Sequence, residues 1–88
     1  MTARIEAIKG ADGTTIRLIG QLDAEYISEL KDQIEANGRV VVLEMHEVKL
    51  VDVDVVRFLI ECELKGIELL GCPAYIREWI ARERGSAK

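Results

Sequence analysis

The sequence predicts a single α/β domain with a mixed, mainly parallel four-stranded sheet and three helices, in the order β-β-α-β-α-β-α. Two observations predict this class. After an initial hairpin pattern, strand-like and helix-like stretches alternate, and strands separated by helices pair in parallel through right-handed crossovers. The 88 residues, 49% hydrophobic and 32% charged, are enough for one modest core. We therefore expect one domain over residues 1–88, with an ordered core from about residue 3 to residue 83.

The first two strands form a predicted hairpin. Apolar residues alternate within Arg4–Lys9 and again within Thr14–Ile19, as expected for half-buried strands. Between them lies Gly10–Gly13, a segment whose glycines and aspartate favour a tight turn. The first strand is therefore expected to be the antiparallel partner of the second.

A helix is predicted after the hairpin. Asp23 is a favourable N-cap residue, and Asn37-Gly38 is a typical helix end. Between these signals, apolar residues recur at helical spacing and form one stripe, made of Tyr26, Ile27, Leu30 and Ile34. This stripe is expected to face the core.

The next strand, Arg39–Glu44, contains the continuous apolar run Val40–Leu43. Such a run indicates burial on both faces, as in parallel sheets, so the strand is expected to lie in the centre of the sheet. We interpret Met45–Val51 as the loop that follows. The one histidine, His46, is then a solvated loop residue, since no recognisable motif spaces a Ser or Cys nucleophile around it.

A second helix is predicted from its N-cap residue Asp52 to about Lys65, with Gly66 as its end. Helical spacing directs one set of residues toward the core and another toward water. The core set is Val56, Leu59, Ile60 and Cys62, and the solvated set is Arg57, Glu61, Glu63 and Lys65.

A short strand, Ile67–Leu70, and a turn lead into a third predicted helix. Pro73 fits the first turn of this helix, because the N–H that proline lacks has no helical partner there. The buried stripe of the helix is expected to be Ile76, Trp79 and Ile80. Residues Glu83–Lys88 are expected to fray.

Composition excludes several classes of function. A net charge of −4 and a pI near 5.0, without a basic stripe, argue against nucleic-acid binding. The amino end lacks the apolar core of a secretion signal, and no apolar run approaches the ~20 residues that span a bilayer, so we expect a cytoplasmic protein. Cys62 and Cys72 form no C-x-x-C pair, and we expect them to be small core residues rather than ligands of a metal or cofactor.

Three stretches resemble one family, the STAS domain, which is the fold of bacterial anti-sigma factor antagonists and of sulfate-transporter tails. They are Gly20–Asp23, Val41–Val48 and Val51–Asp54. The segment Gly66–Cys72 also resembles the strand and turn that follow in short, free-standing members, so the resemblance extends from about Thr15 to Trp79. Many relatives continue with a further strand and helix, which this chain lacks. An uncovered sheet edge or helix face is therefore expected, and it would favour a homodimer or a larger assembly.

The resemblance implies a role for Asp54. In switchable family members, a pattern like Asp-Ser-Ser-Gly stands here, and a partner anti-sigma kinase phosphorylates a serine. Asp52 keeps the acidic position, whereas Asp54 occupies the position that resembles the phosphorylated serine. A carboxylate has less charge and one acceptor oxygen fewer than a phosphate, so Asp54 would imitate the phosphorylated state only in part. The alternative interpretation is that Asp54 merely stabilises the first turn of the helix.

The resemblance also implies a surface for a protein partner, formed by the Met45–Val51 loop and the start of the second helix. Its candidate residues are Asp52, Val53, Asp54, Val55, Arg57, His46 and Glu47. The two valines replace small residues of the family pattern, and they either pack in the core or form an apolar docking spot. We expect a non-enzymatic interaction domain, because these residues make no coherent catalytic set. The expected partner is an anti-sigma factor with serine kinase activity.

The sequence leaves two other functions open. Some STAS relatives bind nucleotides or lipids, and a small ligand would here use the loops after Leu43 and Leu70. The acids near the second helix would repel a phosphate unless a divalent cation bound to Asp52, Asp54 and Glu47. The other function is a scaffold subunit that does not switch. Such a subunit would self-associate through an apolar edge, to which the last helix would contribute Arg77, Trp79 and Arg82.

Overall fold

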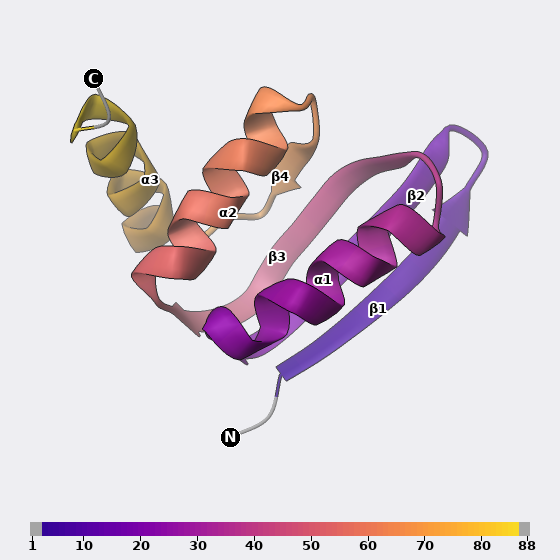
Figure 1. Ribbon diagram of the computed structural model, residues 1–88, viewed down its shortest axis with the longest axis horizontal. Coiled ribbons are helices and arrows are strands. Elements are labelled where there is room, and N and C mark those ends of the chain that lie inside the picture. Colours follow the sequence, from indigo (N-terminus) through magenta and orange to yellow (C-terminus); the bar gives the residue numbers. More distant parts are fainter. Residues whose placement is uncertain (1–2, 87–88) are drawn as a thin grey trace.

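Seven elements follow one another in the order that the sequence predicts (Figure 1). The computed structural model describes residues 3–86. The strands are β1 (Ala3–Gly10), β2 (Gly13–Leu22), β3 (Val40–Val51) and β4 (Glu68–Leu70), and the helices are α1 (Ala24–Ala36), α2 (Val53–Leu64) and α3 (Ala74–Ser86). The α/β fold class with four strands and three helices is confirmed.

The strands form one mixed sheet in the order β1-β2-β3-β4. The hairpin is confirmed, since β1 pairs antiparallel with β2 and the turn is closed by Gly10 opposite Gly13. The other two pairings, β2 with β3 and β3 with β4, are parallel. Strands β1 and β4 are therefore the two edges of the sheet, and β3 lies inside it as predicted.

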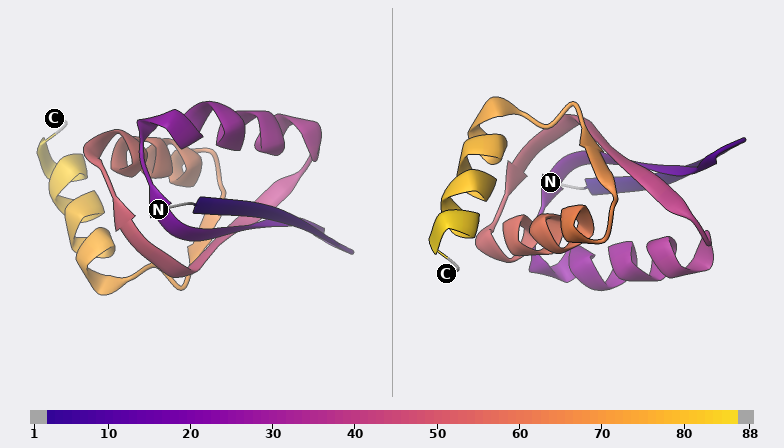
Figure 2. Two further views of the ribbon diagram at one scale, coloured as in Figure 1. Left: turned by 90° about the horizontal axis from the view of Figure 1, so that it is seen from below. Right: turned by 90° about the horizontal axis from the view of Figure 1, so that it is seen from above.

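Helices α1 and α2 cover one face of the sheet, and α3 packs beside α2 (Figures 1 and 2). We call the opposite face of the sheet the open face, because α1 and α2 leave it uncovered. The core lies between the sheet and the helices. Its most deeply buried side chains are Ile16, Leu18, Leu22, Leu43, Met45, Val55, Val56, Leu59, Ile76 and Ile80.

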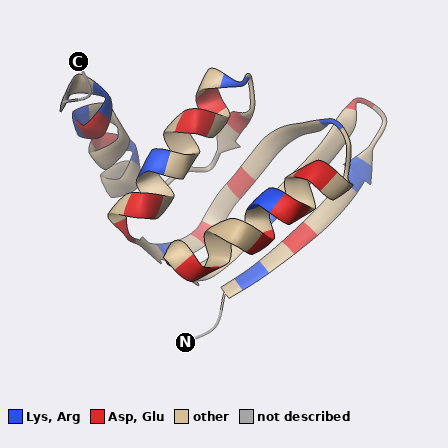
Figure 3. Cartoon of the chain, in the orientation of Figure 1, with Lys and Arg blue, Asp and Glu red and all other residues tan. Residues whose placement is uncertain are grey.

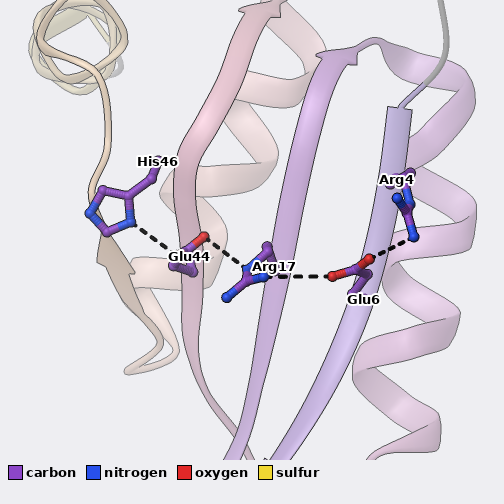
Figure 4. A network of polar contacts seen from close by, with 5 residues as sticks. All are labelled: Arg4, Glu6, Arg17, Glu44 and His46. Atoms are coloured by element: carbon purple, nitrogen blue, oxygen red, sulfur yellow. Dashed lines mark hydrogen bonds and ion pairs between the residues drawn. The ribbon is translucent and has the colours of Figure 1, made fainter.

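The prediction that β3 is buried on both faces is wrong. Leu43 and Met45 are fully buried against the helices. Val40, Val41 and Val42 are only half-buried, and Glu44 projects from the open face (Figure 4). The physical reason is that helices cover this sheet on one side, so a parallel strand here needs only every second side chain to be fully apolar.

The prediction that Met45–Val51 is a loop is also wrong, because β3 continues to Val51. Its backbone pairs with β2, which extends beyond the predicted Ile19 to Leu22. Three register shifts, each leaving extra residues in β3, interrupt this pairing. Such bulges disturb the two-residue alternation of a strand, so the segment does not have the regular pattern that identifies a strand in a sequence. The side chain of His46 is exposed, as predicted, but it belongs to a strand.

The predicted starts and ends of the first two helices are confirmed. Asp23 and Asp52 are the N-cap residues of α1 and α2. Asn37 caps the carboxyl end of α1, and Lys65 caps that of α2. Each is followed by a glycine with positive φ, 67° at Gly38 and 93° at Gly66, a backbone conformation that residues with a Cβ atom rarely adopt.

The third helix differs from its prediction at both ends. It begins at Ala74, and Pro73 precedes it, accepting hydrogen bonds from Ile76 and Arg77 at its carbonyl oxygen. It continues to Ser86, beyond the residue 83 at which the ordered core was expected to end, while residues 87–88 lie outside the described part. Glu83 pairs with Arg57 of α2, which helps to hold this last turn.

The buried stripe of α3 is confirmed at Ile76 and Ile80, whereas Trp79 is half-buried against the core. The stripe packs α3 against α2. Among residues 3–86, no helix has the length and apolar character needed to cross a membrane.

Candidate functional site at the start of α2

Asp52 ties together the amino ends of α1 and α2. Its Oδ1 accepts the backbone N–H of Val55 at 3.0 Å, which is the N-cap bond of α2. Its Oδ2 accepts the backbone N–H of Ala24, the first residue of α1, also at 3.0 Å. Both N–H groups lie in first turns, where they have no partner within their own helix. Both carboxylate oxygens of Asp52 are therefore engaged within the fold.

Asp54 lies beside this junction and is exposed. It is in the first turn of α2, where the helix dipole favours a negative charge. Among residues 3–86, its carboxylate takes part in no hydrogen bond or ion pair, because Asp52 already caps the helix and Arg57 pairs with Glu83. Of the two acids, Asp54 is therefore the one whose charge is available to a partner.

Asp54 is one of the residues that line a groove of about 670 Å³ between α1 and α2. Residues of α1 line one wall, and residues of α2 line the other. The lining residues are Ala24, Ile27, Ser28, Lys31, Asp32, Glu35, Asp54, Arg57, Phe58 and Glu61. The ammonium of Lys31 lies 5.9 Å from the centre of the Phe58 ring, close enough for a cation–π interaction that links the two walls.

The groove is negatively charged. Four of its lining side chains are carboxylates, namely Asp32, Glu35, Asp54 and Glu61, against the two cations Lys31 and Arg57. Acidic residues appear along both helices in Figure 3. The groove cannot be predicted from the sequence, because it depends on how α1 and α2 lie beside each other. Its acidic character has a signal in the sequence, namely the acids on the solvated sides of both helices.

The candidate site residues lie in separate parts of the molecule. Asp52, Asp54 and Arg57 lie together on the first turns of α2. Val55 is only 2% exposed and belongs to the core, so it takes no part in an accessible surface. Val53 is half-buried.

The two candidates on β3 do not join the α2 residues. His46 projects from the open face, where its Nδ1 lies 3.0 Å from Oε2 of Glu44 (Figure 4). Its ring lies over Gly71, so closely that a Cβ atom added there would overlap it. Glu47 is exposed on β3, opposite Ile19 of β2. The Met45–Val51 loop from which the partner surface was expected is a strand, so His46 and Glu47 lie along β3 and not beside the first turn of α2.

The titratable groups of the described residues offer little chemistry. Residues 3–86 contain no group of three His, Cys, Asp or Glu side chains placed to hold a metal ion, so Asp52, Asp54 and Glu47 do not form a cation site. Burial raises the pKa of the Cys62 thiol from 9.0 to about 11 and also raises the pKa of Cys72. Both thiols are therefore protonated near neutral pH, whereas a nucleophilic cysteine requires a thiolate.

No protein-family model matches the chain, and no curated protein matches it. The functional interpretation therefore depends on the geometry of the α2 junction and on the resemblance of short stretches to STAS domains.

Proposed function

We propose that this chain is a non-enzymatic regulatory domain of the anti-sigma factor antagonist type, which acts in the cytoplasm by binding a protein partner. The partner surface consists of the first turn of α2 and the groove between α1 and α2. The expected partner is an anti-sigma factor with serine kinase activity, as the resemblance to STAS domains implies. Asp54 is a fixed negative charge at the position where switchable relatives acquire a phosphate.

The observation that carries the proposal is the different situation of the two neighbouring acids. Both oxygens of Asp52 accept backbone hydrogen bonds, so this acid is part of the fold. Asp54 is exposed two residues after the cap, among the residues that line the groove. A carboxylate without an internal partner on such a surface is suited to attract or repel a partner, and its charge does not depend on a kinase.

The charge of the groove supports a protein partner over a phosphate-bearing ligand. Four carboxylates against two cations favour a basic surface on the partner and repel a nucleotide phosphate. The small-ligand alternative also required a loop after Leu43, but that segment continues as β3. Ligand binding therefore has less support than protein binding.

The experiment that tests the proposal is a pull-down with the wild-type chain and the Asp54→Ser variant, followed by mass spectrometry of the captured proteins. If Asp54 imitates a phosphorylated state, the serine variant should capture an anti-sigma kinase that the wild type captures poorly. The matched control is Asp12→Ser, which removes an exposed acid from the hairpin turn on a different part of the molecule.

Capture should be the same for the control as for the wild type. Equal capture of the kinase by all three proteins would remove the regulatory role of Asp54 and leave it as an acid that stabilises a helix start. Capture of no kinase by any of them would contradict the antagonist function itself.

A further inference from the structure

Strand β1 forms an edge of the sheet that is open to pairing with another strand. It is eight residues long, from Ala3 to Gly10, and within residues 3–86 it pairs with β2 only. Its sequence contains no proline, and its register with β2 has no shift, so the edge is regular along its whole length. Natural proteins usually protect such an edge, because its free N–H and C=O groups can pair with a second chain.

The opposite edge of the sheet is protected. There the strand β4 has only three residues. Where β3 extends beyond β4, the hydroxyl of Tyr75 in α3 donates a hydrogen bond to the carbonyl oxygen of Lys49. A short edge strand and a covering helix are two common ways to prevent pairing with another chain. The edge formed by β1 is therefore the one available to a further strand.

The hairpin determines which backbone groups of β1 face this free edge. Its turn has two residues, so Gly10 and Gly13 form a hydrogen-bonded pair. Hydrogen-bonded pairs alternate along antiparallel strands, so the even-numbered residues of β1 bond to β2 and the odd-numbered residues direct their N–H and C=O groups outward. In agreement, the N–H of Ala3 donates to the hydroxyl oxygen of Tyr26 in α1, at 3.4 Å. The residues with outward groups are Ala3, Ile5, Ala7 and Lys9.

The charges of β1 select one register for a second copy. Two identical edge strands related by a two-fold axis run antiparallel, and their hydrogen-bonded pairs join outward-facing residues. With Ile5 opposite Ile5 of the second copy, Arg4 lies opposite Glu6 of the second copy, and Glu6 lies opposite its Arg4. The next register on either side places Glu6 against Glu6 or Arg4 against Arg4, and like charges directly opposite each other are destabilising.

We propose that two copies of this chain pair through their β1 edges, with Ile5 at the two-fold axis, and so form one continuous sheet. The paired segment is Ala3–Ala7 of each copy. On the open face, Arg4 and Glu6 of the two copies form a square of alternating charges, since Arg4 Nη2 already lies 2.9 Å from Glu6 Oε2 within each chain (Figure 4). On the face covered by helices, Ile5 packs against the core of its own copy, and the pairing extends this apolar layer across the axis.

The contact at β1 is separate from the proposed partner surface. The groove lies between α1 and α2, and no residue of β1 lines it. A second copy at β1 and a regulatory partner at the groove therefore use different parts of the molecule. The inference does not depend on the proposed regulatory function, and the two can fail separately.

The first test is the mass of the pure chain in solution, measured by light scattering from low micromolar to millimolar concentration. We expect a reversible dimer, with twice the 9.9 kDa mass of the chain. Hydrogen exchange followed by NMR should show that the amides of Ile5 and Ala7 become protected as the dimer forms. A chain that stays monomeric would overturn the proposal, as would a dimer that leaves these two amides unprotected.

Two charge reversals make the test specific. In R4E both opposed positions are acidic, and in E6R both are basic, so each variant alone should dimerise at least roughly tenfold more weakly than the wild type. Mixed together, the two variants place opposite charges at both contacts, and native mass spectrometry should detect a heterodimer with few homodimers. The double variant R4E/E6R should dimerise like the wild type, because it only exchanges the two charges. Circular dichroism verifies that each variant is folded.

Each reversal has a matched control with the same change in net charge. K9E matches R4E and lies on the same strand, outside the segment Ala3–Ala7. E29K matches E6R and lies on the exposed surface of α1. Both controls should dimerise like the wild type. Undiminished homodimers of R4E and E6R, or a mixture without a heterodimer, would overturn the pairing.

A proline tests the backbone pairing without changing a charge, which matters because E6R also affects Arg17, 3.8 Å from Glu6. The N–H of Ala7 points away from β2 and its side chain is exposed, so Ala7→Pro leaves the hairpin bonds in place. In the dimer this N–H donates to Ala3 of the second copy, so its loss should weaken association roughly tenfold. Ala7→Ser keeps the N–H and should dimerise like the wild type. A folded Ala7→Pro variant with undiminished dimerisation would contradict the proposal.

Discussion

At the scale of single residues, two acids that are two positions apart have different physical roles. Asp52 has a structural role, since its carboxylate accepts one N–H from each of two helices. Asp54 contributes only its charge, at a helix start that favours it. The sequence predicts the cap at Asp52, but the second hydrogen bond, to Ala24, depends on the approach of α1.

This difference predicts unequal losses of stability. Asp52→Ala removes the cap of α2 and leaves the N–H of Ala24 without its acceptor, so it should lower the free energy of unfolding by about 1–3 kcal/mol. Asp54→Ala removes only a favourable charge and should lower it by roughly 0.3–1 kcal/mol. Urea denaturation of both variants measures the two losses. A loss at Asp54 as large as that at Asp52 would contradict the assignment of the cap.

At the scale of the elements, α3 shows which contacts hold a helix against its neighbour. Its buried residues Ile76 and Ile80 are 0% and 2% exposed. Around them, ion pairs connect α3 with Glu63 and Arg57 of α2, at distances from 2.9 to 3.7 Å. These pairs are partly exposed, so water and salt weaken them. Apolar burial is therefore the main source of the α2–α3 contact.

Two substitutions in α3 test whether apolar burial stabilises the α2–α3 contact more than the ion pairs do. Ile80→Ala leaves a cavity in the core and should lower the free energy of unfolding by about 2–5 kcal/mol. Arg77→Ala removes the 2.9 Å pair with Glu63 and should lower it by less than about 1 kcal/mol. Thermal denaturation in low and high salt distinguishes the two effects, since only the ion pair should weaken with salt. A larger loss for Arg77→Ala would show that α3 is held mainly by its charges.

At the scale of the whole molecule, the sheet separates two unlike surfaces. The helices bury the apolar side and form the acidic groove, and the open face carries the ion-paired side chains Glu6, Arg17 and Glu44. Burial between these layers also controls ionisation. Cys62, at 3% exposure, has its pKa raised to about 11, mainly because burial disfavours the thiolate.

The raised pKa predicts a loss of stability at alkaline pH. Below pH 9.0, the ordinary pKa of the thiol, Cys62 is protonated in both the folded and the unfolded chain. Between about pH 9 and pH 11 the unfolded chain loses this proton and the folded chain retains it, so the free energy of unfolding falls.

Urea denaturation at several pH values measures this decrease. The Cys62→Ala variant should show a smaller decrease than the wild type, because Cys72 and Tyr75, whose pKa values are also raised, remain in both proteins. Equal decreases in the wild type and the variant would contradict the assignment to Cys62.

Much of the fold was predictable because its signals are local. The hairpin turn at Gly10–Gly13, the caps at Asp23 and Asp52 and the stripe around Ile76 depend on residues close in sequence. The part that failed was β3. Its register shifts interrupt the two-residue alternation of buried and exposed side chains. Only the pairing with β2 shows that Met45–Val51 is extended.

The sequence by itself determined the order of the elements, both helix caps and the acid at the start of α2, because each depends on the conformational preferences of neighbouring residues. Only the tertiary structure decided which side of the sheet is covered. It separated His46 from Asp54, joined Asp52 to α1, and brought Glu6, Arg17 and Glu44 side by side across three strands. These relations connect residues that are far apart in the chain, and they exist only once strand pairing and helix packing bring those residues together.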